Sequence, residues 1–151
     1  MHIYAFRSPL LVVTLVAASL SSGAAQAIEY YNANKESTYP ISDGVQVGKL
    51  LYLSGKLGID PATKKLAVGG ITPEAKGAME MIKSTLEAHK YKMSDIVKCT
   101  VFLADVKELP AFNEVYKTYF QPLHYPGRSA VGVSGLALDA RVEVECIAAK
   151  P

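Results

Sequence analysis

The sequence has little net charge and few residues arranged for metal binding. Its 151 residues include 16 Lys and Arg against 14 Asp and Glu, a formal net charge of +2. A protein that grips the phosphate backbone of a nucleic acid usually has a marked basic excess, so nucleic acid is not the expected partner. His, Cys and Asp nowhere recur with metal-ligand spacing, and no Ser, His and Asp arrangement stands out. We therefore expect neither a metal ion nor an organic cofactor.

The sequence also lacks an apolar run long enough to cross a bilayer, which takes about 20 residues. Its longest run, residues 10–20, follows a weakly basic start that ends at Arg7. An Ala-Gln-Ala sequence at residues 25–27 has the small-x-small pattern that signal peptidase cleaves. We interpret residues 1–27 as a signal peptide cut after Ala27, with a transmembrane anchor as the alternative. Cleavage removes one basic residue and no acid. The signal peptide predicts a secreted or periplasmic protein without a membrane anchor.

Cysteine is scarce, since the chain contains only Cys99 and Cys146. An even number of cysteines in an exported protein allows a disulfide. Both residues, however, lie inside apolar runs with the character of strands, where a free thiol behaves as a small hydrophobic side chain. We therefore expect two buried thiols, with the disulfide as the alternative.

The remaining chain has the length of one domain and no repeat or low-complexity tract. Residues 28–38 are polar and are expected to form a flexible leader, and residues 39–151 form the domain. Runs of β-branched and apolar residues predict strands, and apolar stripes with helical spacing predict two helices, the first with Thr72 as its N-cap. The predicted order is β-β-α-β-α-β-β, with strands over residues 45–47, 50–54, 95–105, 128–133 and 141–149 and helices over residues 73–86 and 108–120.

Side-chain alternation in the last predicted strand separates two faces of the sheet. One face receives Val142, Val144, Cys146 and Ala148 and suits helices lying on the sheet, whereas the other receives Arg141, Glu143, Glu145 and Ile147. Two helices can cover only one face. We expect copies of the same chain to associate through the mixed apolar and charged face that remains open.

Five motifs follow one another along the domain: LYLSGK at residues 51–56, DIVKCTVFLAD at 95–105, FNEVY at 112–116, YPGRS at 125–129 and VEVECIA at 142–148. They resemble the successive motifs of the RidA/YjgF family of reactive intermediate deaminases, over about residues 40–150. The resemblance implies an α+β fold related to bacterial chorismate mutase, in which two helices pack on one face of a mixed sheet. It also implies a homotrimer with three clefts at the subunit interfaces.

The resemblance further assigns roles to individual residues. Arg128 corresponds to the arginine that holds the substrate carboxylate, and a guanidinium suits this role because it can donate two parallel hydrogen bonds. Glu143 corresponds to a glutamate that positions the attacking water, which a carboxylate can orient or deprotonate. Ser54 and Asn113 match residues of the same cleft, and Ser129 follows the arginine in its motif.

Each of these assignments has an alternative. Arg128 could form an ion pair with Glu143 or Glu145 across a neighbouring strand. Ser54 and Asn113 could serve as turn or cap residues.

Two positions depart from the family pattern. Ile41 stands near the start of the domain where relatives have an aromatic residue, and Ala130 replaces a cysteine two residues beyond Arg128. Hydrolysis of an imine depends on an anchored carboxylate and a placed water more than on a thiol. The implied function is metal-free deamination of small carboxylate-bearing enamines and imines, of the 2-aminoacrylate type, to a keto acid and ammonia. A non-catalytic ligand-binding or holdase-like trimer and an endoribonuclease are the alternatives.

Overall fold

The computed structural model describes residues 26–32 and 39–151. The predicted signal peptide falls almost entirely outside this part of the chain. Within the described ranges, no helix has the length and apolar character needed to cross a membrane. The main elements are β1 (Ile28–Tyr31), β2 (Gly44–Val47), β3 (Leu50–Leu53), β4 (Lys56–Leu57), α1 (Ile71–Ala88), β5 (Ile96–Leu103), α2 (Leu109–Tyr116), β6 (Gly127–Gly132) and β7 (Val142–Ala149).

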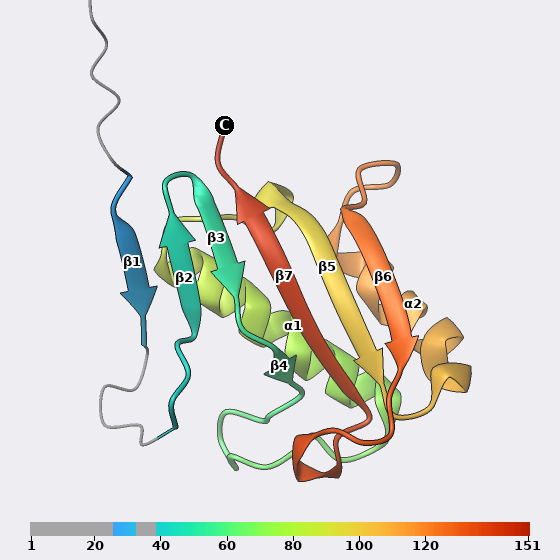
Figure 1. Ribbon diagram of the computed structural model, residues 1–151. Helices are drawn as coiled ribbons and strands as arrows, with labels where there is room; N and C mark the ends of the chain where they lie inside the picture. The colour runs from blue at the N-terminus through green and yellow to red at the C-terminus, as the bar shows by residue number, and fades with distance from the viewer. Residues whose placement is uncertain (1–25, 33–38) are drawn as a thin grey trace, which may run out of the picture.

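One mixed sheet carries both helices on the same face and leaves its other face uncovered (Figure 1). The strand order is β1-β2-β3-β7-β5-β6, and β4 also pairs with β7. Neighbouring strands are antiparallel except for β5 and β6, which are parallel and are connected through α2. The predicted α+β fold, with a mixed sheet and two helices on one face, is confirmed.

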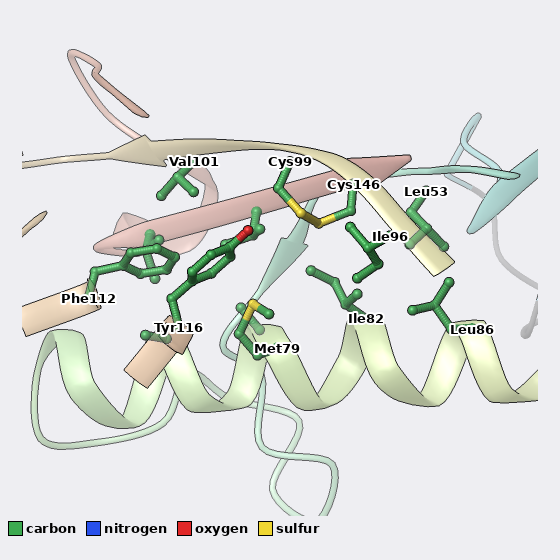
Figure 2. Packing of buried hydrophobic residues seen from close by; sticks show 14 of the residues in the cluster. Leu53, Met79, Ile82, Leu86, Ile96, Cys99, Val101, Phe112, Tyr116 and Cys146 are labelled. Atoms are coloured by element: carbon green, nitrogen blue, oxygen red, sulfur yellow. A yellow bond between two sulfur atoms is a disulfide. The ribbon is translucent and has the colours of Figure 1, made fainter. Parts of the chain in front are cut away.

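The core lies between the sheet and α1 (Figure 2). The alternation predicted for the last strand is confirmed, because Val142, Val144 and Ala148 are fully buried beneath the helices. Met79 and Ile82 of α1 are equally inaccessible on the opposing side. Complete burial of an aliphatic side chain contributes about 1.5–3 kcal/mol, so this layer fixes the position of α1 on the sheet.

Helix α1 begins earlier than predicted, with Gly70 and not Thr72 at its N-cap. Gly70 has φ +89°, a left-handed conformation that glycine adopts without steric cost. Glu74 in the first turn is buried, and its Oε2 accepts a hydrogen bond of 2.8 Å from the backbone N–H of Arg141. The carboxylate therefore links the start of α1 to the residue before β7.

The segment predicted to be a flexible leader contains a strand. Residues 28–31 form β1, which pairs antiparallel with β2 at the edge of the sheet. The Tyr31 hydroxyl donates a 2.7 Å hydrogen bond to Gln46 Oε1, and the Tyr31 ring stacks on His89 with centroids 3.7 Å apart. These contacts join residues that are distant in sequence. The polar composition of residues 28–38 therefore could not indicate that part of this segment forms a strand. Residues 33–38 lie outside the described ranges.

The expectation of two buried thiols is wrong, because Cys99 and Cys146 form a disulfide. They lie directly opposite each other on the antiparallel strands β5 and β7, with Cα atoms 4.1 Å apart. Both side chains point to the helix-covered face and are buried. Neither cysteine remains free. The prediction that both cysteines lie in buried strands is confirmed. The disulfide was not predicted because it depends on β5 and β7 being neighbours in the sheet.

Candidate functional site

Arg128 lies on the edge strand β6, on the side that faces α2. In the parallel register it is the partner of Cys99, whose side chain points to the helix-covered face. The guanidinium carbon Cζ lies 4.6 Å from the centroid of the Tyr116 ring and 5.8 Å from that of Phe112. The Arg128 side chain thus extends from the edge strand of the sheet toward two aromatic side chains of α2.

A pocket of about 300 Å³ opens beside this guanidinium. Its wall brings together two predicted site residues, Arg128 and Asn113, from β6 and α2. The Asn113 Oδ1 atom is buried and has no hydrogen-bond partner among the described residues, which leaves one acceptor unused at the pocket. The full lining is Asn113, Tyr116, Lys117, Tyr125, Pro126 and Arg128.

The described charges around the pocket leave Arg128 without a counter-ion. Lys117 is neutralised by Glu114, with Nζ and Oε2 2.5 Å apart. Among the residues that the structure describes, Arg128 itself forms no ion pair and no hydrogen bond through its side chain. The alternative of an ion pair with Glu143 or Glu145 is therefore wrong, because β5 separates β6 from β7.

Glu143 lies on the other face of the sheet. It alternates with the buried residues Val142 and Val144 on β7 and pairs in register with Phe102 of β5. Its carboxylate lies against the connection between β3 and β4, where a Cβ on Gly55 would fall 1.8 Å from Glu143 Oε1. A carboxylate held at the open face can orient a water molecule or accept its proton.

Ser54 neighbours this carboxylate through Gly55, but its hydroxyl is already engaged. Ser54 Oγ donates a 2.5 Å hydrogen bond to the backbone carbonyl of Ser42, and its N–H bonds the carbonyl of Asp43. Ser54 therefore orders the loop beside Glu143.

Ser129 does not join the pocket of Arg128. It follows Arg128 on β6 and so points to the opposite face, where its Oγ accepts a 2.7 Å hydrogen bond from Lys98 Nζ. In a single chain the predicted residues thus form two groups on opposite faces, Arg128 with Asn113 and Glu143 with Ser54.

Sequence reasoning missed Tyr116 and Gly55 as members of the site. Tyr116 was assigned to the apolar stripe of its helix, although it stands three residues after Asn113 in the FNEVY motif. Burial raises the pKa of the Tyr116 hydroxyl to about 12, and the neighbouring Arg128 charge acts in the opposite direction. Tyr116 therefore remains neutral across the physiological pH range.

The two departures from the family pattern have different surroundings. Ala130 lies two residues beyond Arg128 on the same face of β6 and packs against the core. Ile41 and the neighbouring Tyr39 are both exposed.

No group of three or more His, Cys, Asp or Glu in residues 26–32 and 39–151 is arranged to hold a metal ion.

The open face carries the mixture predicted from the sequence. Tyr52 and Val131 are each 43% exposed there, beside the charged residues Lys98 and Glu145. Tyr30 of β1 extends the same face at the opposite edge of the sheet and is 68% exposed.

Comparisons with known proteins agree with this architecture. The family model described as endoribonuclease L-PSP matches residues 32–150. A 2-iminobutanoate/2-iminopropanoate deaminase of Dermatophagoides farinae is 44% identical over 108 residues, covering 72% of this chain and 84% of that protein. The crystal structure of RidA from the Antarctic bacterium Psychrobacter sp. PAMC 21119 is 32% identical with a TM-score of 0.71, covering 84% of this chain and 99% of that one.

A second structure, E. coli TdcF with bound serine, is also 32% identical with a TM-score of 0.71 and covers 76% of this chain and 91% of that one. The resemblance predicted from the five motifs is thereby confirmed, and the chain belongs to the RidA/YjgF family.

Proposed function

We propose that this protein hydrolyses small imines and enamines that carry a carboxylate, of the 2-aminoacrylate type, to a keto acid and ammonia. The observation that carries the proposal is the guanidinium of Arg128, which lines a pocket and has no polar partner within the described residues. A free guanidinium edge binds a carboxylate through two parallel charge-assisted hydrogen bonds. The relative named 2-iminobutanoate/2-iminopropanoate deaminase acts on compounds of this class.

The ligand of a similar structure supports the same chemistry. E. coli TdcF was crystallised with serine, an amino acid that carries a carboxylate next to a nitrogen-bearing carbon. An imino acid has the same two groups. In our chain Arg128 would bind the carboxylate, and the unpaired Asn113 Oδ1 could accept a hydrogen bond from the nitrogen.

The hydrolytic step requires a water molecule at the imine carbon. We assign its orientation to Glu143, which takes a proton as the water oxygen bonds to the carbon. Glu143 passes this proton to the imine nitrogen, which gives a carbinolamine. The second proton of the former water then moves from the new hydroxyl to the nitrogen as the C=O bond forms and the C–N bond breaks, so that ammonia and the keto acid leave. By binding the adjacent carboxylate, Arg128 keeps the reacting carbon in place throughout these steps.

Because Arg128 and Glu143 lie on opposite faces of one chain, we propose that the complete site forms between two copies. One copy would supply Arg128 and Asn113, and the next would supply Glu143, beside the loop that Ser54 orders. The exposed apolar residues of the open face support association there, in the homotrimer that the family resemblance implies. The molar mass of the purified protein in solution tests this assembly.

The catalytic proposal is tested by ammonia release from freshly generated 2-iminopropanoate. The protein should accelerate release, and Arg128→Ala and Glu143→Gln should each abolish most of the acceleration. Arg141→Ala is a matched control, because this arginine is paired with Glu108 outside the pocket. A wild-type rate equal to that of buffer would contradict the proposal.

We also propose that the protein is exported after cleavage at Ala27. The disulfide between Cys99 and Cys146 supports this location, since disulfides persist in oxidising compartments. Recovery of the full-length chain from the reducing cytosol, with no processed form outside it, would contradict export.

A further inference from the structure

The guanidinium of Arg128 lies beside two aromatic rings of α2. Its Cζ atom lies 4.6 Å from the centroid of the Tyr116 ring, within the range of a cation–π contact. The Phe112 ring is more distant, at 5.8 Å. No side-chain hydrogen bond or ion pair of Arg128 occurs within residues 26–32 and 39–151.

The two kinds of contact use different parts of the guanidinium. An aromatic ring attracts its flat face, whereas a carboxylate binds the N–H groups at its edge. A protein carboxylate as the orienting partner would occupy the edge and compete with the ligand. A contact with the ring of Tyr116, by contrast, leaves the N–H edge available to a ligand.

The Tyr116 ring is itself held in a fixed position. It is 4% exposed and contacts the rings of Phe112 and Phe120, with centroids 5.5 Å and 4.8 Å away. Figure 2 shows its side chain reaching from α2 toward the sheet, within the buried cluster. Its hydroxyl is buried and has no hydrogen-bond partner in the part of the chain that the structure describes, so the hydroxyl does not explain why a tyrosine ring lies here.

We propose that Tyr116 is a positioning residue for Arg128, which holds the guanidinium face so that its N–H edge meets the carboxylate of the substrate. This inference rests on the proposed function of the site. It assigns the effect to the ring and gives the hydroxyl no part in binding.

The test compares Tyr116→Phe with Tyr116→Leu in the hydrolysis of 2-iminopropanoate. Tyr116→Phe keeps the ring and should retain KM within about twofold of the wild type. Tyr116→Leu removes the stacking and should raise KM roughly tenfold while kcat changes less, because the lost interaction serves binding of the carboxylate. Tyr91→Leu is the matched control, since Tyr91 is also a buried tyrosine but its ring contacts Lys150 and not Arg128, and its KM should stay close to that of the wild type.

Equal KM values for wild type and Tyr116→Leu would overturn the proposal, as would an equal loss in Tyr116→Phe and Tyr116→Leu. Thermal melting identifies a variant that fails to fold, and Tyr116→Met then replaces it because methionine fills irregular apolar space. Affinity for 2-oxopropanoate, measured through ligand-induced stabilisation, separates this inference from the proposed reaction. If the wild type binds the keto acid without turning over the imine, the reaction fails, but the variants must still follow the predicted order of affinity.

Discussion

The carboxylate of Glu143 occupies the space that a side chain on Gly55 would need. A Cβ at residue 55 would lie 1.8 Å from Glu143 Oε1 and 2.7 Å from its Cδ, both far inside van der Waals contact. Glu143 also pairs in register with Leu57 of β4, so the two-residue strand and the glycine before it together form the surface on which the carboxylate rests. The absence of a side chain at Gly55 therefore positions the residue assigned to orient water.

Replacement of Gly55 by alanine should consequently impair catalysis more than folding. The Glu143 side chain can rotate away from the new methyl group, so we expect the free energy of unfolding to fall by about 1 kcal/mol or less. Rotation moves the carboxylate from its position, and kcat for imine hydrolysis should fall at least roughly tenfold. Gly135→Ala is the control, because a Cβ there meets no atom within 4 Å. Wild-type kcat in Gly55→Ala would show that the position of this carboxylate does not matter.

The disulfide should make a large contribution to stability. It closes a loop with a sequence separation of 47 residues, for which chain entropy predicts a contribution of about 4 kcal/mol. Denaturant unfolding of the protein in which Cys99 and Cys146 are both replaced by alanine measures this quantity. Reductant should lower the free energy of unfolding of the wild type and leave that of the double variant unchanged. An equal response of both proteins to reductant would refute the assignment.

Local patterns predicted most of the fold because they act over short distances. Alternation along β7 correctly placed Val142 and Val144 beneath the helices. The stripe of α1 was also correct, although the left-handed backbone of Gly70 moved the start of the helix from Thr72. A two-residue strand such as β4 has no periodicity to detect and was not predicted.

Features that depend on strand neighbours were beyond local reasoning. The insertion of β5 between β6 and β7 pairs Cys99 with Cys146 and also separates Arg128 from Glu143. The family resemblance named the latter two residues without indicating that one chain holds them on opposite faces. Tyr116 was overlooked for a related reason, since helical spacing alone does not distinguish a core ring from one that also contacts an arginine.

The burial of His89 beside the Tyr31 ring should make stability depend on pH. Burial lowers the pKa of His89 below its usual value near 6.5, and the neighbouring Asp43 charge only partly opposes this shift. The unfolded chain therefore binds a proton more readily, so the stability that neutral His89 supports is lost as pH falls below about 6.5. His89→Phe keeps a ring against Tyr31 and cannot be protonated. Its melting temperature should fall less than that of the wild type between about pH 7 and pH 5, and parallel curves would contradict the prediction.

Tyr116 and Arg128 should be coupled at alkaline pH. Burial raises the pKa of Tyr116 from 10.0 to about 12, whereas the Arg128 charge stabilises the phenolate and lowers it. Because the folded state retains this proton after the unfolded state has lost it, stability should fall as pH rises from 10.0 toward about 12. Tyr116→Phe should weaken that decline, and the difference in phenolate absorbance between Tyr116→Phe and wild type reports the ionisation of Tyr116. When the same absorbance difference is measured in an Arg128→Ala background, the midpoint of the Tyr116 titration should lie at higher pH. An unchanged titration there would mean that the cation does not lie against this ring in solution, and the stacking inferred for the carboxylate pocket would lose its basis.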